Sequence, residues 1–400
     1  MEAVSALAKE APQMRRLLSG GDDAAASWSM DSAESVEPWL PFSTDSADSL
    51  LACDEDESSL ELPGGSPELA RSLPGGDAPF STLPIAGASH MAFMASDTRE
   101  TIRNELARLN ELRYAPDRPE AQRFACCDRP RVVSWMVEVV TAVGLSEETL
   151  HSAVSLLDRF VQGTETLPPE HVLQLLALAC VSIAAKHEEV AQHRADDWVG
   201  LAVDSDNNPL YLRDDLQRME WLLLETVEWR IRVPSALTFL RHYHHALAHG
   251  PASPGVVPSD PAGLAAFKAC SNFLAELSLM YDTFLSYGYS TVAAACLVLA
   301  EWTSQGAAPA TPAGPAGPGG AAVPAAPAAA PVIRTVAALT AVAGVDVAAL
   351  APNLASCVEV LHQLHSRATT GGHPGGLPPR AAELGLLAPV VMRYQPPNRR

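Results

Sequence analysis

The sequence lacks the features that mark membrane, secreted and zinc-ribbon proteins. No run of 18 or more apolar residues is free of charges and helix breakers, so we expect no membrane-spanning helix and no membrane partner. The N-terminus has no basic start followed by an apolar stretch, which argues against a secretory signal. The seven cysteines include no C-x-x-C pair, so we expect a reducing compartment without a disulfide framework.

Catalytic and metal-binding signatures are also missing. There is no glycine-rich phosphate loop and no G-x-S-x-G string, so we expect a protein that is not an enzyme. A calcium-loop-like string starts at Asp204, but Pro209 stands where the sharp turn needs glycine. Histidines cluster near residue 245 without a third carboxylate or thiolate ligand, so we expect no metal and no other cofactor.

Charge is unevenly distributed. The formal net charge of −20 argues against nucleic acid as a partner. Residues 1–97 hold 17 acidic and 4 basic side chains, and residues 1–95 are rich in Ser, Asp, Glu, Pro and Gly. Such a segment buries too little apolar surface to offset its ordering entropy, so we predict a disordered acidic tail over residues 1–95.

The pattern of residues 96–232 is almost entirely helical. A first helix is predicted over Arg99–Tyr114, and Gly144 ends a second apolar stripe. Ser146 is a predicted N-cap for a third helix. Residues 171–189 are apolar on nearly every side, which places them at the centre of a bundle, and a fifth helix covers residues 216–229.

A second helical unit is predicted over residues 233–368. It is interrupted by residues 306–331, which are nearly pure Ala, Pro and Gly and are predicted to form a linker. Residues 369–400 are again rich in Gly and Pro and are predicted to be a flexible C-terminal tail. The sequence therefore predicts an all-α protein with two tandem five-helix units.

Several strings in the first unit resemble the cyclin box: RPRVVSWMVEV, LLDRF, LQLLALACVSIAAKHEE and LQRMEWLLLETVEWRI. STVAAACLVLAEW and CVEVLHQL are similar to the more variable second box. The resemblance covers about residues 97–304 and 332–365. It implies two tandem five-helix cyclin-box domains in a regulatory subunit that binds and activates a cyclin-dependent kinase.

The resemblance also implies a kinase-binding site. Lys186 and Glu220 match the residues through which cyclins bond the mobile αC (PSTAIRE-type) helix of the kinase, and His187 and Trp229 lie beside them in the sequence pattern. From position alone, Lys186 could also be a solvated charge that suits the helix dipole. Lysine is scarce in this chain, with three lysines among 27 basic residues, which favours a specific need for an ammonium group.

Two further sets of residues match family features. Arg129 and Asp158 match a buried salt bridge with a structural role. A second set matches the patch that docks Arg-x-Leu peptides of substrates, although Asp128 and Arg131 depart from the mitotic pattern and Trp135 could instead fill the core. That set consists of Val132, Trp135, Glu138, Leu173 and Gln174.

The acidic tail carries an L-x-C-x-E string formed by Leu51, Cys53 and Glu55. Retinoblastoma-like pocket proteins bind such a string as an extended peptide. Its place before a cyclin box is typical of plant and algal D-type cyclins, which implies a role in the G1/S transition. The alternatives are a mitotic or transcriptional cyclin and a TFIIB-like transcription factor with the cyclin fold.

Regulation is implied by three proline-directed phosphorylation sites in predicted loops, at Ser66, Ser253 and Thr311. Lys9 is the predicted main ubiquitin acceptor, since the other lysines lie in folded regions. The resemblance therefore implies kinase inhibitors and a ubiquitin ligase as additional partners. It also implies a location in the nucleus, with the cytoplasm as a second location.

Overall fold

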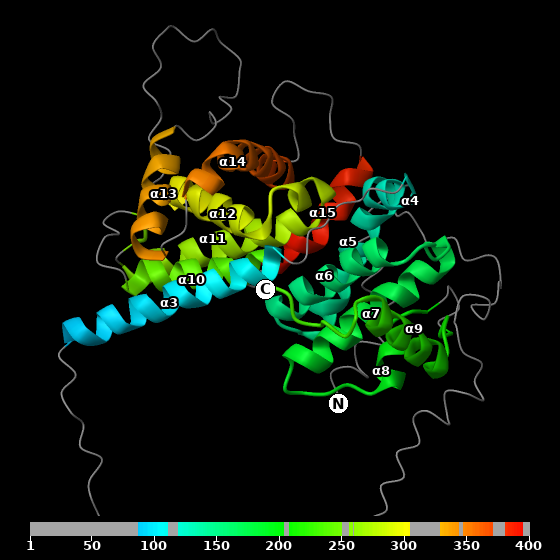
Figure 1. Cartoon of the computed structure of the whole chain (residues 1–400). Coiled ribbons are helices and arrows are strands. Elements are labelled where there is room, and N and C mark those ends of the chain that lie inside the picture. Colours follow the sequence, from blue (N-terminus) through cyan, green and yellow to red (C-terminus); the bar gives the residue numbers. More distant parts are fainter. Residues whose placement is uncertain are drawn as a thin grey trace, which may run out of the picture.

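The computed structural model describes residues 87–110, 119–203, 208–249, 256–258, 260–304, 329–343, 347–370 and 381–394. Within these ranges the regular elements are all helices, with one isolated bridge between Val203 and Pro209. The prediction of an all-α protein is confirmed. Two helical domains stand side by side (Figure 1). None of the helices described is long and apolar enough to cross a bilayer.

The first domain is built around a helix that is apolar on every side. In α7 (Glu170–Glu188), every residue from Val172 to Ala185 is buried, as the sequence predicts. The other helices of the domain are α4 (Pro119–Arg123), the π-helix η4 (Phe124–Asp128), α5 (Arg129–Val143), α6 (Glu147–Gly163), α8 (Ala195–Val199) and α9 (Arg213–Thr226). A helix such as α7 has to be covered all round, and α5, α6, α8 and α9 pack against it, while η4 packs beside α5 and α4 packs on η4 to complete the domain.

The predicted helix boundaries between α5 and α6 are present. Gly144 closes α5 with φ of +78°, a left-handed conformation that glycine adopts without steric cost. The Ser146 hydroxyl then accepts a hydrogen bond from the Thr149 amide at 3.3 Å, which caps α6. These two signals fix a short, sharp connection.

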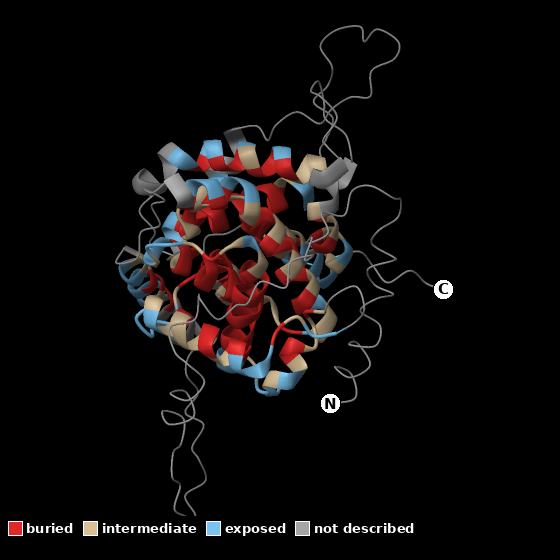
Figure 2. Cartoon of the chain, turned by 90° about the vertical axis from the view of Figure 1, so that its right-hand side faces the viewer, coloured by how far each residue is buried: buried red, intermediate tan, exposed pale blue. Residues whose placement is uncertain are grey.

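The second domain repeats this plan around α12 (Tyr289–Ser304), which is buried from Ser290 to Glu301. Figure 2 shows the buried centre of the molecule surrounded by half-exposed outer helices. The predicted linker lies outside the described residues except for its last three positions, which belong to α13. The helices around α12 are α10 (Ala236–His249), α11 (Pro261–Leu279), the 3₁₀ helix η5 (Asp282–Ser286), α13 (Ala329–Ala343) and α14 (Val347–Thr370).

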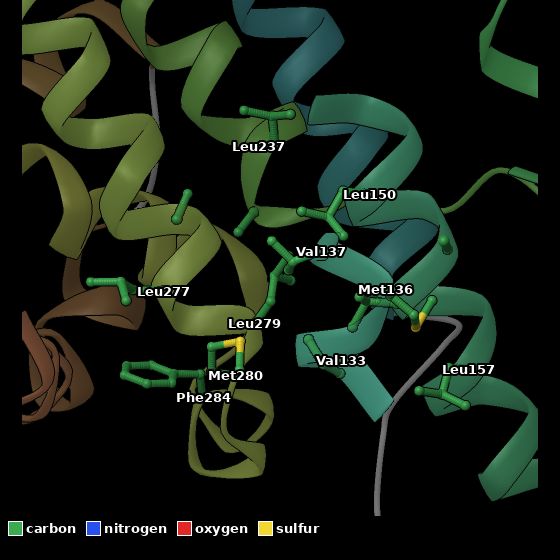
Figure 3. Close-up of a cluster of buried hydrophobic side chains, with 14 of the residues drawn as sticks. Val133, Met136, Val137, Leu150, Leu157, Leu237, Leu277, Leu279, Met280 and Phe284 are labelled. Atoms are coloured by element: carbon green, nitrogen blue, oxygen red, sulfur yellow. The ribbon is translucent and has the colours of Figure 1, made fainter. Parts of the chain in front are cut away.

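The two domains share one apolar core. Figure 3 shows Val137 of α5 beside Leu279 of the second domain, and Val133 and Met136 of α5 belong to the same buried cluster. Their side chains are buried, so the junction excludes water as the interior of each domain does. The labelled residues from the second domain are Leu237, Leu277, Leu279, Met280 and Phe284.

The first predicted helix differs from expectation. It is α3 (Gly87–Asn110), which begins ten residues before Asp97 and ends before Tyr114. It packs on α10 and α13, so it lies against the second domain and not within the first. Ile102 is buried in this contact, and the Thr98 hydroxyl lies 3.2 Å from Nδ1 of His245. Periodicity identified the apolar face, but not the helices that cover it.

The predicted flexible tail also contains a helix. Within residues 369–400, α15 (Ala381–Tyr394) packs against α5, α11 and α14 and so contacts both domains. Leu387 and Val390 are buried on the side that makes these contacts. The sequence-based prediction missed this helix because the apolar stripe that contains Leu387 and Val390 is surrounded by Gly and Pro residues.

Candidate functional site

A surface ion pair joins the two central predictions. Lys186 is in the last turn of α7 and Glu220 is on α9, 34 residues further along the chain. The Lys186 ammonium donates to both carboxylate oxygens of Glu220, at 2.7 and 2.6 Å. The Lys186 side chain is 48% exposed, so a partner molecule can reach it. The structure therefore places a half-exposed cation beside a carboxylate that is only 12% exposed, at the surface of the domain.

The end of α7 that carries Lys186 is held firmly. Glu189 accepts hydrogen bonds from the Ser146 amide at 2.7 Å and from the Thr149 hydroxyl at 2.6 Å. Burial opposes ionisation of Glu189, but these hydrogen bonds outweigh it and lower its pKa. Glu188 accepts from the Ser152 hydroxyl at 2.9 Å. The two glutamates after Lys186 thus fasten α7 to the start of α6.

Trp229 reaches the same face through an unusual turn. Glu228 and Trp229 have φ of +55° and +59°, a conformation that costs non-glycine residues on the order of 1–2 kcal/mol each. The turn carries the chain back to α9, where the Trp229 amide donates to the Leu224 carbonyl at 2.9 Å. The ring of Trp229 packs edge-on against Trp221 with 5.6 Å between centroids. It remains 55% exposed, which is rare for such a large apolar group.

A surface pocket lies beside this tryptophan. His187 and Trp229 line it together with residues that the sequence analysis did not single out. The alternation of charged and apolar residues from 229 to 232 could have indicated three of them, but Arg108 comes from a distant helix. The additional lining residues are Arg108, Arg230, Ile231, Arg232 and Pro234.

Arg129 and Asp158 form a buried, bidentate ion pair. Nε and Nη2 of Arg129 donate to the two carboxylate oxygens of Asp158 at 2.7 and 3.0 Å. Nη1 donates to the Leu279 carbonyl at 2.8 Å, which links α5 of the first domain to α11 of the second. Both side chains are at most 4% exposed. The pair therefore joins the two domains as well as two helices.

The comparisons with known proteins agree with this architecture. Residues 99–232 match the family described as Cyclin, N-terminal domain, and residues 234–313 match Cyclin, C-terminal domain. Together the two matches cover more than half of the chain. The chain belongs to the cyclin family. Cyclins are non-catalytic regulatory subunits of kinases, which confirms the prediction that the chain is not an enzyme.

The similar proteins are A-type cyclins. Cyclin-A2-1 of Arabidopsis thaliana is 33% identical over 172 residues, which are 43% of this chain and 35% of that protein. Cyclin-A1-2 of the same plant is 36% identical over 175 residues, or 44% and 36% of the two chains. The chain thus spans about a third of the length of these relatives. They give no support to the predicted D-type subclass, and the family match removes the TFIIB-like alternative.

Among solved structures, a viral cyclin from herpesvirus saimiri is similar at a TM-score of 0.42 and 16% identity. The match covers 59% of this chain and 85% of the viral one. The kinase-binding prediction therefore rests on the geometry above and on the family, and not on this superposition.

The predicted docking patch offers little open apolar surface. Val132 and Leu173 are buried in the core of this cyclin, and Gln174 is 5% exposed. Trp135 and Glu138 remain partly exposed. Trp135 is thus not wholly taken up by the core, and the docking patch stays a prediction.

The remaining candidate residues lie outside the described part of the chain, so the structure does not place them. They are the pocket-protein string and the three phosphorylation sites: Leu51, Cys53, Glu55, Ser66, Ser253 and Thr311. Among the residues that the structure does describe, no group of three His, Cys, Asp or Glu side chains could hold a metal ion.

Proposed function

We propose that this cyclin binds and activates a cyclin-dependent kinase of the PSTAIRE type through Lys186, Glu220, His187 and Trp229. The observation that carries the proposal is the surface Lys186–Glu220 ion pair, with a half-exposed lysine, followed by His187, which lines one pocket with the exposed Trp229. An ammonium group can donate to backbone carbonyls of a partner and a carboxylate can accept from its amides. Trp229 supplies apolar area beside them, as interface anchors do.

Binding of this kind would act on the kinase by position alone. A cyclin that holds the αC helix of its partner selects the arrangement in which the kinase's own Lys–Glu pair and magnesium site form. The end of α7 suits this task because Glu188 and Glu189 fix it to α6. A rigid donor loses little conformational freedom on binding.

The test is a double charge exchange, Lys186→Glu with Glu220→Lys. Because the two side chains pair with each other, the exchange keeps an ion pair on the surface and should leave the fold intact. It reverses the groups offered to a partner, so we expect loss of kinase binding in a pull-down and loss of histone kinase activity. Circular dichroism of the purified variant checks its fold.

The matched control is Arg131→Glu with Glu170→Arg, which exchanges the charges of a surface pair with a 2.7 Å contact on another part of the domain. We expect this control to bind and activate the kinase as the original chain does. Equal binding by the Lys186–Glu220 variant would contradict the proposed site. No binding by the original chain would contradict the proposed function.

We further propose that Leu51, Cys53 and Glu55 bind a retinoblastoma-like pocket protein, as in D-type cyclins that act at the G1/S transition. The proposal rests on the L-x-C-x-E string alone. We expect a pull-down of the pocket protein by the full chain to be lost with Cys53→Ala and Glu55→Lys, while kinase binding stays unchanged. Retention of the pocket protein by both variants would rule the string out.

Regulation through Ser66, Ser253 and Thr311, through kinase inhibitors and through a ubiquitin ligase remains part of the same proposal, as does a nuclear location. Each has a direct test in cells. Phosphate should be found at these residues by mass spectrometry, Lys9→Arg should lengthen the half-life, and a fluorescent fusion should accumulate in the nucleus. A half-life unchanged by Lys9→Arg would exclude that residue as the main acceptor.

A further inference from the structure

The pocket beside Trp229 contains three arginines contributed by two distant parts of the chain. Arg108 lies near the end of α3, and Arg230 and Arg232 follow the turn after α9. His187, Trp229, Ile231 and Pro234 complete the walls. We call this set the arginine pocket. In a chain with a formal net charge of −20, such a concentration of cations on one surface is unexpected.

A buried carboxylate lies close to two of these arginines. Glu105 of α3 lies 3.5 Å from Nη1 of Arg108 and 3.7 Å from Nη2 of Arg232, and its own side chain is 9% exposed. Both separations are longer than a strong hydrogen bond. Glu105 therefore lies within ion-pairing distance of both arginines, whose side chains stay accessible at 48% and 60% exposure.

The surroundings of the arginines favour binding of an anion. Each guanidinium group presents a planar fork of N–H donors that matches a carboxylate. Trp229 and Ile231 line the same pocket and add apolar surface beside the charges. The third arginine, Arg230, lies 3.7 Å from Glu228, which is itself exposed and outside the pocket lining.

We propose that the arginine pocket binds an acidic side chain of the kinase subunit. The inference rests on the proposed function, because His187 and Trp229 belong both to this pocket and to the proposed kinase contacts. A kinase segment bonded at Lys186 and Glu220 that runs on past His187 enters the arginine pocket. The pocket then selects kinases that carry Asp or Glu at that point.

A different occupant is conceivable on charge alone, namely the acidic N-terminal segment of this chain. Residues 1–97 carry 17 acidic side chains against 4 basic ones. An occupant from the same chain would compete with the kinase. Removal of an arginine would then strengthen kinase binding, whereas an acidic kinase residue predicts the opposite sign.

The experiment measures the affinity of the full chain for a purified PSTAIRE-type kinase as a function of salt concentration. We expect Arg108→Gln and Arg232→Gln each to weaken binding about tenfold, because each removes one charge-assisted contact. The salt dependence of the affinity should become shallower in both variants. The matched control is Arg103→Gln, which removes an exposed arginine from the same helix outside the pocket and should change neither quantity.

The outcomes separate this inference from the proposed function. If the Lys186–Glu220 exchange abolishes binding while both arginine variants bind as the original chain does, the arginine pocket is excluded and the kinase site stands. Tighter binding by the arginine variants would assign the pocket to the acidic segment and overturn the inference. Thermal unfolding of each variant, within about 1 °C of the original chain, excludes loss of fold as the cause.

Discussion

The central helices of the two domains, α7 and α12, are alike in burial but differ in what happens to the charge near their C-terminal ends. On α7, Lys186 is half-exposed and pairs with Glu220 at the surface. On α12, Glu301 is fully buried, accepts a hydrogen bond from the Thr335 hydroxyl at 2.6 Å and pairs with Arg334 at 3.0 Å. In the second domain α13 supplies buried partners, whereas in the first domain the ion pair lies at the surface with its lysine half-exposed.

This difference shows how one architecture serves two purposes. A buried, fully bonded carboxylate stabilises the packing of its own domain but offers nothing to another molecule. An exposed pair contributes little to stability and keeps its donors and acceptors for a partner. Under the proposed function, the recognition surface lies mainly on the first domain, and the second domain supports it.

The second domain can support the first only if the two domains unfold as one cooperative unit. The substitution Arg129→Met tests this cooperativity. The substitution leaves Asp158 buried without its partner and also removes the donor to the Leu279 carbonyl. We expect a loss of about 3–5 kcal/mol in the free energy of unfolding, the largest effect among these predictions. Chemical denaturation followed by circular dichroism should show a single transition at lower denaturant.

The control for that prediction is Arg129→Met combined with Asp158→Leu. Removal of both charges avoids the stranded carboxylate, so the double variant should recover part of the lost stability. Two separate transitions in either variant would show that the domains unfold independently.

A second buried glutamate of the second domain, Glu276 of α11, should make the stability of the protein depend on pH. Its burial raises its pKa to about 7, although Arg393 of α15 lies 3.4 Å away and acts in the opposite direction. Glu147 and Tyr394 also face this carboxyl group. The folded state therefore holds a proton that the unfolded chain releases near its ordinary pKa of 4.5.

The free energy of unfolding should consequently fall as the pH rises from about 4.5 to about 7, because the folded state binds more protons than the unfolded state. The loss from this group is on the order of 2–3 kcal/mol. Glu276→Gln keeps the shape but cannot ionise, so its stability should vary less across that window. An identical pH profile for both proteins, measured by urea unfolding, would show that Arg393 keeps Glu276 ionised.

The substitution Glu301→Ala tests the comparison between the buried carboxylate of α12 and the surface ion pair of α7. It removes the acceptor of the buried Thr335 hydroxyl, so we expect a loss of about 2 kcal/mol in stability and no change in kinase affinity. Glu220→Gln in the first domain should do the reverse, with a stability change below about 0.5 kcal/mol and weaker kinase binding. Similar losses of stability in both variants, measured by denaturant unfolding, would remove the distinction between the two domains.

The sequence predicted the central helices well because their burial is complete. A run such as residues 172–185 has no polar face, so only the centre of a bundle can accommodate it. The packing of α3 on the second domain was not predictable, since periodicity shows which face is apolar but not which helix covers it. In α15, Pro389 and the surrounding glycines concealed an apolar stripe that contains Leu387 and Val390.

The candidate site was predicted only in part. Lys186 and Glu220 came from a resemblance, and no periodicity could have placed them within hydrogen-bonding distance. The fifth helix was predicted to reach Trp229, whereas α9 ends at Thr226. The positive φ angles after it accompany the packing of Trp229 on Trp221, a tertiary contact that local preferences do not encode.

That turn gives the smallest expected effect and a test of its cause. Among the residues described, Glu228 and Trp229 are the non-glycine residues with positive φ. Glu228→Gly relieves the steric cost but gives the unfolded chain more freedom, so we expect a net gain of about 0.5 kcal/mol in the free energy of unfolding.

Gly144→Ala is the matched opposite in the same domain. A Cβ there meets nothing within 4 Å, so its expected cost of about 1 kcal/mol is conformational alone. Thermal unfolding measures both variants. If Glu228→Gly instead lowers stability by as much as Gly144→Ala, then the Glu228 side chain, through its pair with Arg230, holds the turn that presents Trp229.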